Sequence, residues 1–211
     1  MSGKTLNNFY SLIFMKNKIC IIFIILGLFF TQNTFAFEKK AEDFISKTTN
    51  NAKLIILNNK FSMIDKKKRL EELALEVVDT DGLARYTLGE KRKTISNEDM
   101  RNYINIFKIF FSKKISNNLA DYSDQEVKVL GSKKISQIYV LVKSKIVSKI
   151  DKQEIKVDWR VFLINDKLVI RDLVVEGLSL ARAQREEFSS IIANKGFEGL
   201  IKNLNDFIAK N

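Results

Sequence analysis

The stretch from Ile155 to Val175, IKVDWRVFLINDKLVIRDLVV, decides the fold class. Residues 155–164 and 168–175 are rich in Val, Ile and Leu and largely alternate in polarity, as strands with one buried face do. Asn165 and Asp166 separate the two runs, and such a pair is typical of a tight hairpin turn. The stretch therefore predicts two antiparallel strands joined by a hairpin.

Two further strands are predicted upstream, over residues 127–130 and 135–148, because the same alternation continues there. Gly131-Ser132 and residues 149–152 are expected to form the connecting turns. Both faces of these strands carry apolar side chains, including Tyr139 and Leu141 on the side opposite Val140. This surplus indicates either a solid core or the wall of a cavity for an apolar ligand, and the pattern does not separate the two.

On both sides of the strands, apolar side chains recur at three- and four-residue steps, which predicts amphipathic helices. The expected helices cover residues 38–58, 65–78, 83–88 and 100–119, with two more after Ser179 that are separated at Gly196. Helices, then strands, then helices indicate an α+β fold. We expect an antiparallel meander of about four strands with the N-terminal and C-terminal helices packed on it.

Residues 1–36 resemble a cleavable export signal. Lys16 and Lys18 precede an uncharged apolar run over residues 19–30, and Thr34-Phe35-Ala36 fits a small-x-small cleavage site. We therefore expect a mature domain over residues 37–211 in the periplasm; if Met15 is the true start, residues 1–14 are an extension. The alternative is an uncleaved anchor, for which the run is short of the roughly 20 residues that span a bilayer.

Composition excludes several classes of chemistry. The chain has no His, and its only Cys, Cys20, lies in the predicted signal. A Ser-His-Asp triad, a His-ligated metal and a mature thiolate nucleophile are therefore absent. The eight glycines give neither nucleotide-binding spacing. Most familiar enzyme chemistries are thereby excluded, and we expect no cofactor or metal.

The formal net charge of +11 leaves three interpretations for the basic residues. They can be a solvated surface, they can attract anionic lipids or acidic partners, or they can bind nucleic acid. The export signal argues against nucleic acid, and the aromatic residues follow a helix stripe instead of being interleaved with the lysines as base stacking requires.

The C-terminal third carries a more specific pattern. Val157-Asp-Trp-Arg160 is followed by Leu168-Val-Ile-Arg-Asp-Leu-Val-Val-Glu-Gly-Leu-Ser-Leu180 and then by Arg185-Glu-Glu-Phe188. This order resembles the MlaC family, the toluene-tolerance family of periplasmic phospholipid-binding proteins, and the likeness extends over roughly residues 41–208. The chain departs from the family at Glu90-Lys91-Arg92, where a Tyr-Trp pair is common.

The resemblance implies a non-enzymatic lipid carrier whose acyl chains lie in a pocket between sheet and helices. It also implies partners: phospholipid, an outer-membrane lipoprotein or porin complex, and an inner-membrane ABC transporter with an MCE-domain protein. We expect a monomer. The pocket is expected to be lined by Leu83, Leu88, Phe107, Phe111, Val140, Val142, Val157, Trp159, Val161, Leu173, Val175, Phe188 and Ile192.

Five motif residues have structural interpretations. Asp172 is expected to pair with Arg160 or Arg171, and Glu176-Gly177 to form a corner in which Gly177 takes an unusual backbone angle. Ser179 would cap the following helix, and Arg185 would either pair with Glu176 or face a lipid phosphate. Two rival functions remain: a hydrolase built on the carboxylates of Asp158, Asp172 and Glu176, and an adaptor protein with a filled core.

Overall fold

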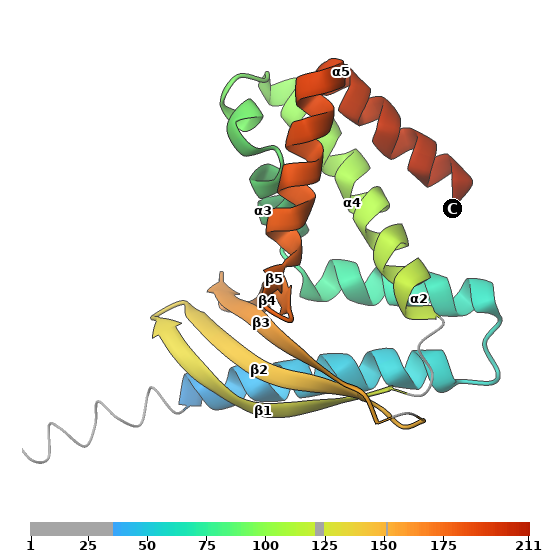
Figure 1. The fold of residues 1–211 in the computed structure, drawn as a ribbon, viewed down its shortest axis with the longest axis vertical. Helices are drawn as coiled ribbons and strands as arrows, with labels where there is room; N and C mark the ends of the chain where they lie inside the picture. Colours follow the sequence, from blue (N-terminus) through green and yellow to red (C-terminus); the bar gives the residue numbers. More distant parts are fainter. Residues whose placement is uncertain (1–35, 121–124, 151) are drawn as a thin grey trace, which may run out of the picture.

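The computed structural model describes residues 36–120, 125–150 and 152–211 (Figure 1). Residues 1–35, on which the signal-peptide prediction rests, lie outside the described residues. Within the described part, no helix combines the length and the apolar character that a membrane crossing needs.

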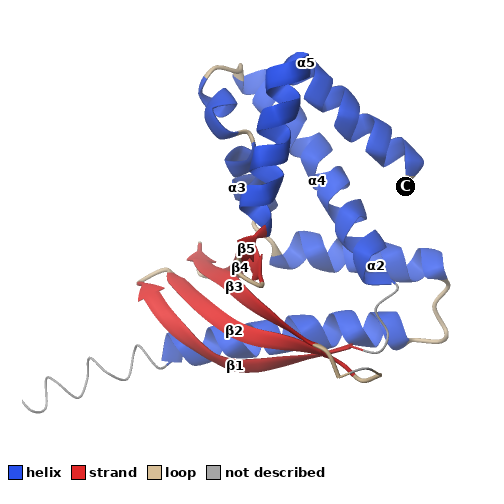
Figure 2. Ribbon diagram, viewed as in Figure 1, coloured by secondary structure: helices blue, strands red, loops and turns tan. Residues whose placement is uncertain are grey.

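The strands form one antiparallel meander in which each strand pairs with the next along the chain (Figure 2). They are β1 Gln125–Ser136, β2 Tyr139–Ser148, β3 Glu154–Ile164, β4 Lys167–Val175 and β5 Leu178–Ser179. The predicted α+β class and meander are confirmed. The short β5 is one strand more than expected.

One predicted turn is confirmed and another is wrong. Asn165 and Asp166 join β3 to β4 with φ values of 48° and 61°, the left-handed pair that a type I′ turn requires. Gly131-Ser132 lies inside β1, where the φ of 140° at Gly131 and a register shift mark a β-bulge. The chain turns at residues 137–138, so Ile138 is 52% exposed and does not share the buried face of Val140.

The expected helices are confirmed, with a short 3-10 turn added. An N-terminal helix covers residues 36–57, followed by α2 Met63–Val77, α3 Thr80–Thr87, the 3-10 helix η1 Gly89–Lys93, α4 Asn97–Ala120 and α5 Leu180–Lys210. Gly196 interrupts α5 with a φ of 73°, so α5 is two helices meeting at a kink, as the sequence predicts.

Side chains fix where these helices begin. Asp79 accepts a hydrogen bond from the N–H of Gly82 and starts α3. The Ser96 hydroxyl accepts from the N–H of Asp99 at 3.0 Å and starts α4. Such caps satisfy N–H groups that the first helical turn leaves free.

The N-terminal helix runs across one face of the sheet. Helices α4 and α5 lie on the other side of α2 from the N-terminal helix (Figure 1). Ala41 and Ile45 of this helix are fully buried against Val140, Val142 and Val161. We call this apolar group the sheet cluster. It anchors the helix to the sheet through burial worth about 1.5–3 kcal/mol for each large side chain.

The same helix also holds β1, the free edge of the sheet. The carboxylate of Glu38 accepts the backbone N–H of Lys134 at 2.6 Å, and the carboxylate of Glu42 accepts the hydroxyl of Ser132 at 2.8 Å. The edge strand is thus tied to the helix by polar contacts as well as by apolar packing.

Candidate functional site

Seven of the predicted pocket residues come from strands and share one face of the sheet. Cross-strand pairing places Val140 opposite Val161, Val142 opposite Trp159, and Val157 opposite Val175. Leu173 pairs with Trp159 on the same side. This is the face that the N-terminal helix covers, so the register gathers all seven side chains on the inner side of the sheet.

The other six predicted residues lie in α3, α4 and α5 or, for Leu88, directly after α3, and they belong to a different cluster. Phe107 contacts Phe188 edge-on, with ring centroids 6.3 Å apart, and stacks with Phe111 at 6.0 Å. Leu88 is buried in the same group, and Leu83 and Ile192 pack against it. We call this group the helix cluster. The predicted lining is therefore divided between two cores.

Exposure divides the thirteen residues further. Seven of them are 2% exposed or less: Leu88, Phe107, Val140, Val142, Val157, Val161 and Phe188. A side chain with so little accessible area borders no space wide enough for water, and an acyl chain is wider than water. In this structure these seven side chains are packed core, and their contact with lipid stays a prediction.

The remaining six are half-buried: Leu83, Phe111, Trp159, Leu173, Val175 and Ile192. Their accessible area makes them the members of the predicted lining that a ligand can reach without repacking of the core. Whether they contact lipid stays a prediction.

Trp159 has its polar atom satisfied on the inner face. Its Nε1–H donates to the hydroxyl of Ser144 at 2.8 Å, and that hydroxyl donates to the carbonyl of Val157 at 2.9 Å. The indole is therefore held in one orientation while part of its apolar ring keeps accessible area.

A buried carboxylate organises the corner between sheet and helix. Asp172 is 8% exposed, and its Oδ2 accepts the Ser179 hydroxyl at 2.6 Å and lies 3.2 Å from Nη1 of Arg160. Its Oδ1 accepts the N–H of Ala181 at 2.9 Å. The predicted pairing of Asp172 with Arg160 is confirmed, and Arg171 pairs instead with Asp79 at 2.7 Å.

The corner itself depends on positive φ angles. Glu176 and Gly177 have φ values of 47° and 86°, and the Ser179 hydroxyl accepts the N–H of Arg182 at 3.1 Å to cap α5. Both the unusual angle at Gly177 and the cap at Ser179 are as predicted.

The predicted pairing of Arg185 with Glu176 is wrong. The carboxylate of Glu176 accepts the backbone N–H of Lys156, while the Arg185 guanidinium lies 5.3 Å from the centre of the Tyr86 ring. The two partners lie on different elements, so each finds a nearer contact. A contact between Arg185 and a lipid phosphate stays a prediction.

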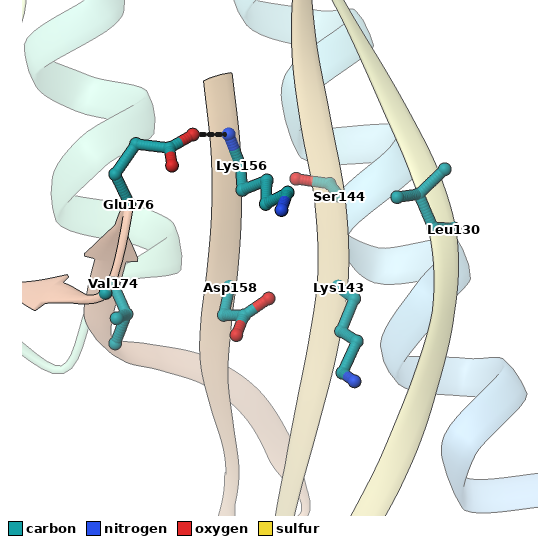
Figure 3. A pocket seen from close by; sticks show the side chains of 8 residues that line it. Leu130, Lys143, Ser144, Lys156, Asp158, Val174 and Glu176 are labelled. Atoms are coloured by element: carbon teal, nitrogen blue, oxygen red, sulfur yellow. Dashed lines mark hydrogen bonds between the residues drawn. The ribbon is translucent and has the colours of Figure 1, made fainter. Parts of the chain in front are cut away.

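The sheet face opposite the N-terminal helix holds a pocket of about 520 Å³ that the sequence did not reveal (Figure 3). Its lining combines two lysines and two acids with apolar groups: Leu130, Lys143, Ser144, Lys156, Asp158, Val174, Glu176 and Gly177. The polar side of the β2–β3 alternation, Lys143 with its partner Asp158, was the signal for this site. Because both charge signs are present, the pocket favours no single charged ligand.

Two of the three acids of the rival hydrolase hypothesis, Asp158 and Glu176, line this pocket, while Asp172 lies apart with both oxygens bound in the corner. The carboxylate of Glu176 accepts the backbone N–H of Lys156 (Figure 3). A glycosidase-like pair needs one carboxylic acid and one carboxylate aimed at the same bond. Among the described residues, no group of three His, Cys, Asp or Glu side chains could hold a metal ion.

Comparisons with known proteins identify a matching family and a similar solved structure. The family model described as "MlaC protein" matches residues 46–206. A solved structure, that of the phospholipid-binding protein of Ralstonia solanacearum in complex with a phospholipid, superposes with a TM-score of 0.68. It is 16% identical and covers 81% of this chain and 97% of its own.

The family match spans the sheet, the corner at Asp172 and most of the helix cluster, which is well over half of the chain. The likeness to the Ralstonia structure shows that the fold is shared. A search of curated protein sequences finds no match. The breadth of the family match establishes that this chain belongs to the MlaC family.

Proposed function

We propose that the protein is a phospholipid carrier of the periplasm, exported by a signal peptide over residues 1–36. The observation that carries this proposal is the family match across residues 46–206. The fold shared with a phospholipid-bound protein supports it. So does the fringe of half-buried apolar side chains around two separate clusters.

The lipid-facing residues are proposed to be the six half-buried members of the predicted lining. Trp159, Leu173 and Val175 belong to the inner face of the sheet, and Leu83, Phe111 and Ile192 to the helix cluster. Between them lies α2, whose Leu73 packs on the sheet cluster while its Glu71 accepts the hydroxyl of Ser116 in α4. Acyl chains beside α2 would reach both sets.

Transfer energetics favour a carrier over a freely exchanging binder. Moving acyl chains out of water gains about 0.8 kcal/mol for each buried methylene. Two chains of about 16 carbons would gain more than about 20 kcal/mol before the cost of ordering them is subtracted. Such a ligand does not leave into water at a useful rate, so it is handed over by contact.

The proposed partners are an outer-membrane lipoprotein or porin complex and an inner-membrane ABC transporter with an MCE-domain protein. The carrier is proposed to act as a monomer and to leave ATP hydrolysis to the transporter. The absence of a nucleotide-binding spacing among its glycines agrees with this division.

Lipid extraction of the purified, exported protein tests the proposal. Mass spectrometry is expected to find co-purifying phospholipid. Leu173→Trp, which enlarges a half-buried side chain on the inner face, is expected to lower the lipid content while the circular dichroism spectrum is unchanged. Leu130→Trp, on the outer face and 61% exposed, is the matched control and is expected to retain lipid. Protein that carries no phospholipid in any preparation contradicts the proposal.

A further inference from the structure

The turn that joins the N-terminal helix to α2 exposes several large apolar side chains. Leu54 is 61% exposed, Leu57 44%, Met63 50% and Ile64 80%. We call residues 53–69 the basic corner. It lies at the end of the molecule where the N-terminal helix turns into α2 (Figure 1). The inward side of α2 is formed instead by Leu70, Ala74 and Val77, so these exposed residues are not part of a core.

Hydrogen bonds give the corner a defined shape. The Asn58 side chain accepts the N–H of Lys60 at 2.9 Å. The Ser62 hydroxyl accepts the N–H of Asp65 at 3.1 Å, and the Asp65 carboxylate accepts the N–H of Ser62 at 3.2 Å. This reciprocal capping box fixes the start of α2. Met63 and Ile64 are therefore displayed by an ordered first turn of a helix.

The apolar side chains are surrounded by cations. Residues 53–69 contain six cations, Lys53, Lys60, Lys66, Lys67, Lys68 and Arg69, against the single acid Asp65. The hydrogen bonds from Ser62 engage that acid and hold its pKa below the usual value. Among the described residues, none of the six cations forms an ion pair with an acid. Arg69 lies over the ring of Phe61, 4.2 Å from its centre, and the charges of the five lysines are left for an external partner.

Charge and apolarity together restrict the occupant. An apolar patch alone fits any hydrophobic surface, but six cations that no acid neutralises through an ion pair repel a second copy of the same corner. A bilayer containing anionic lipids offers phosphates for the cations and a hydrocarbon boundary for the apolar side chains. Interfacial segments that combine these two features bind in the headgroup region of membranes.

We propose that the basic corner docks on the surface of an anionic phospholipid bilayer, with Met63 and Ile64 inserted at the headgroup boundary and the lysines on lipid phosphates. This surface is separate from the proposed lipid-facing residues. Docking is therefore independent of whether a lipid is carried, although it would bring a carrier to its source of lipid.

Vesicle flotation of the exported protein tests the docking. Binding is expected to vesicles of phosphatidylcholine mixed with phosphatidylglycerol, and not to vesicles of phosphatidylcholine alone. Added salt is expected to weaken it, because screening acts on exposed charges. The double variant Met63→Ser/Ile64→Ser is expected to lower the partition coefficient roughly tenfold or more, since it removes the inserted groups. The control Ile135→Ser/Ile138→Ser alters two exposed apolar side chains elsewhere, 49% and 52% accessible, and is expected to bind normally.

The charge contribution has its own pair of variants. Lys66→Gln/Lys67→Gln/Lys68→Gln is expected to abolish the preference for anionic vesicles, whereas Lys133→Gln/Lys143→Gln/Lys156→Gln on the sheet is expected to keep it. Circular dichroism checks that each variant is folded.

Three results overturn the proposal: no binding to either vesicle, equal binding to both vesicles, or normal binding by the Met63 and Ile64 variant. It is also overturned if the sole effect of Ile64→Ser is to abolish a concentration-dependent dimer, since the corner would then bind a second copy. Binding of an acidic protein to the corner, without binding of vesicles, overturns it as well. Lipid extraction of the same variants separates this test from that of the carrier. Corner variants are expected to retain co-purified phospholipid, so loss of docking and loss of carriage are distinct outcomes.

Discussion

Asp172 on β4 holds the start of α5 through Ser179, whose hydroxyl donates to its Oδ2 at 2.6 Å. The same carboxylate accepts the N–H of Ala181 and pairs with Arg160 on the neighbouring strand. One buried side chain thus links the sheet to the helix that supplies Phe188 to the helix cluster. The family motif around Asp172 is explained by this link without any catalytic role.

Replacing Asp172 by Ala is expected to lower the free energy of unfolding by about 3 kcal/mol. The change leaves a buried N–H at Ala181 without a partner and removes the pair with Arg160. Asp172→Asn, which keeps one acceptor, is expected to lose about 1–2 kcal/mol. Urea denaturation followed by circular dichroism measures both.

Asp158→Ala is the control for this comparison, because Asp158 lies on the same sheet face and lines the open pocket instead of the corner. It is expected to change the unfolding free energy by less than about 0.5 kcal/mol. Equal losses for Asp158→Ala and Asp172→Ala would remove the argument for a structural corner.

Tyr103 predicts a loss of stability at alkaline pH. It is fully buried in α4 and shares a hydrogen bond of 2.8 Å with the hydroxyl of Thr87. Burial raises the pKa of its hydroxyl well above the ordinary value, so the folded state holds this proton more tightly than the unfolded state. The resulting stabilisation is complete below the unfolded pKa of about 10 and is lost as the pH rises above it.

Tyr103→Phe is expected to flatten this alkaline decline while lowering stability near neutral pH by about 1 kcal/mol, because the bond to Thr87 is lost. The free energy of unfolding in urea, measured from neutral pH to above the tyrosine pKa, gives both values. Tyr86→Phe, at a half-buried position on α3, is the control and should leave the decline unchanged. A decline that persists in full in Tyr103→Phe refutes the assignment to Tyr103.

Substitution of Gly196 is expected to lower stability through backbone strain and not through altered packing. Its φ of 73° is unfavourable for other residues, and a Cβ built at this position meets nothing within 4 Å. Gly196→Ala is therefore expected to lower stability by about 1–2 kcal/mol through strain alone. Lys195→Ala, at the preceding exposed position, should be nearly neutral. If thermal denaturation shows Gly196→Ala to be as stable as the parent protein, the kink is not required.

Trp159 provides a spectroscopic test of the lipid site, because it is the only tryptophan in the chain. If lipid occupies the inner side of the sheet, phospholipids with brominated acyl chains should quench its fluorescence on loading, since bromine quenches only at contact. Unbrominated lipid of the same headgroup is the control. Loading without quenching would place the acyl chains away from Trp159.

Local patterns carried most of the fold prediction. The turn predicted at Asn165-Asp166 and the helix break predicted at Gly196 are confirmed, because a few neighbouring residues decide each of these features. The turn predicted at Gly131-Ser132 is wrong because a glycine at a β-bulge gives the same sequence signal as a glycine in a turn. Only the pairing of Gly131 with Lys143 distinguishes the two, and that pairing is a property of the assembled sheet.

The site was less predictable than the fold. The alternation in β3 correctly placed Val157, Trp159 and Val161 on one face, but it does not say how completely each is packed. The sequence leaves Arg185 either paired with Glu176 or facing a lipid phosphate, and neither alternative includes its contact with Tyr86, which joins α5 to α3. Long-range contacts of this kind follow from tertiary packing, which the spacing of residues along the chain does not predict.

The contacts of Glu38 and Glu42 with β1 affect how readily the protein aggregates through the edge of its sheet. A free sheet edge offers unpaired N–H groups on which a second molecule can grow a shared sheet. In β1 the N–H of Lys134 already donates to Glu38, and a bulge bends the strand at Gly131. The strand also carries the charged side chains of Lys128, Lys133 and Lys134. These features disfavour pairing of β1 between two molecules and so lower the tendency to aggregate.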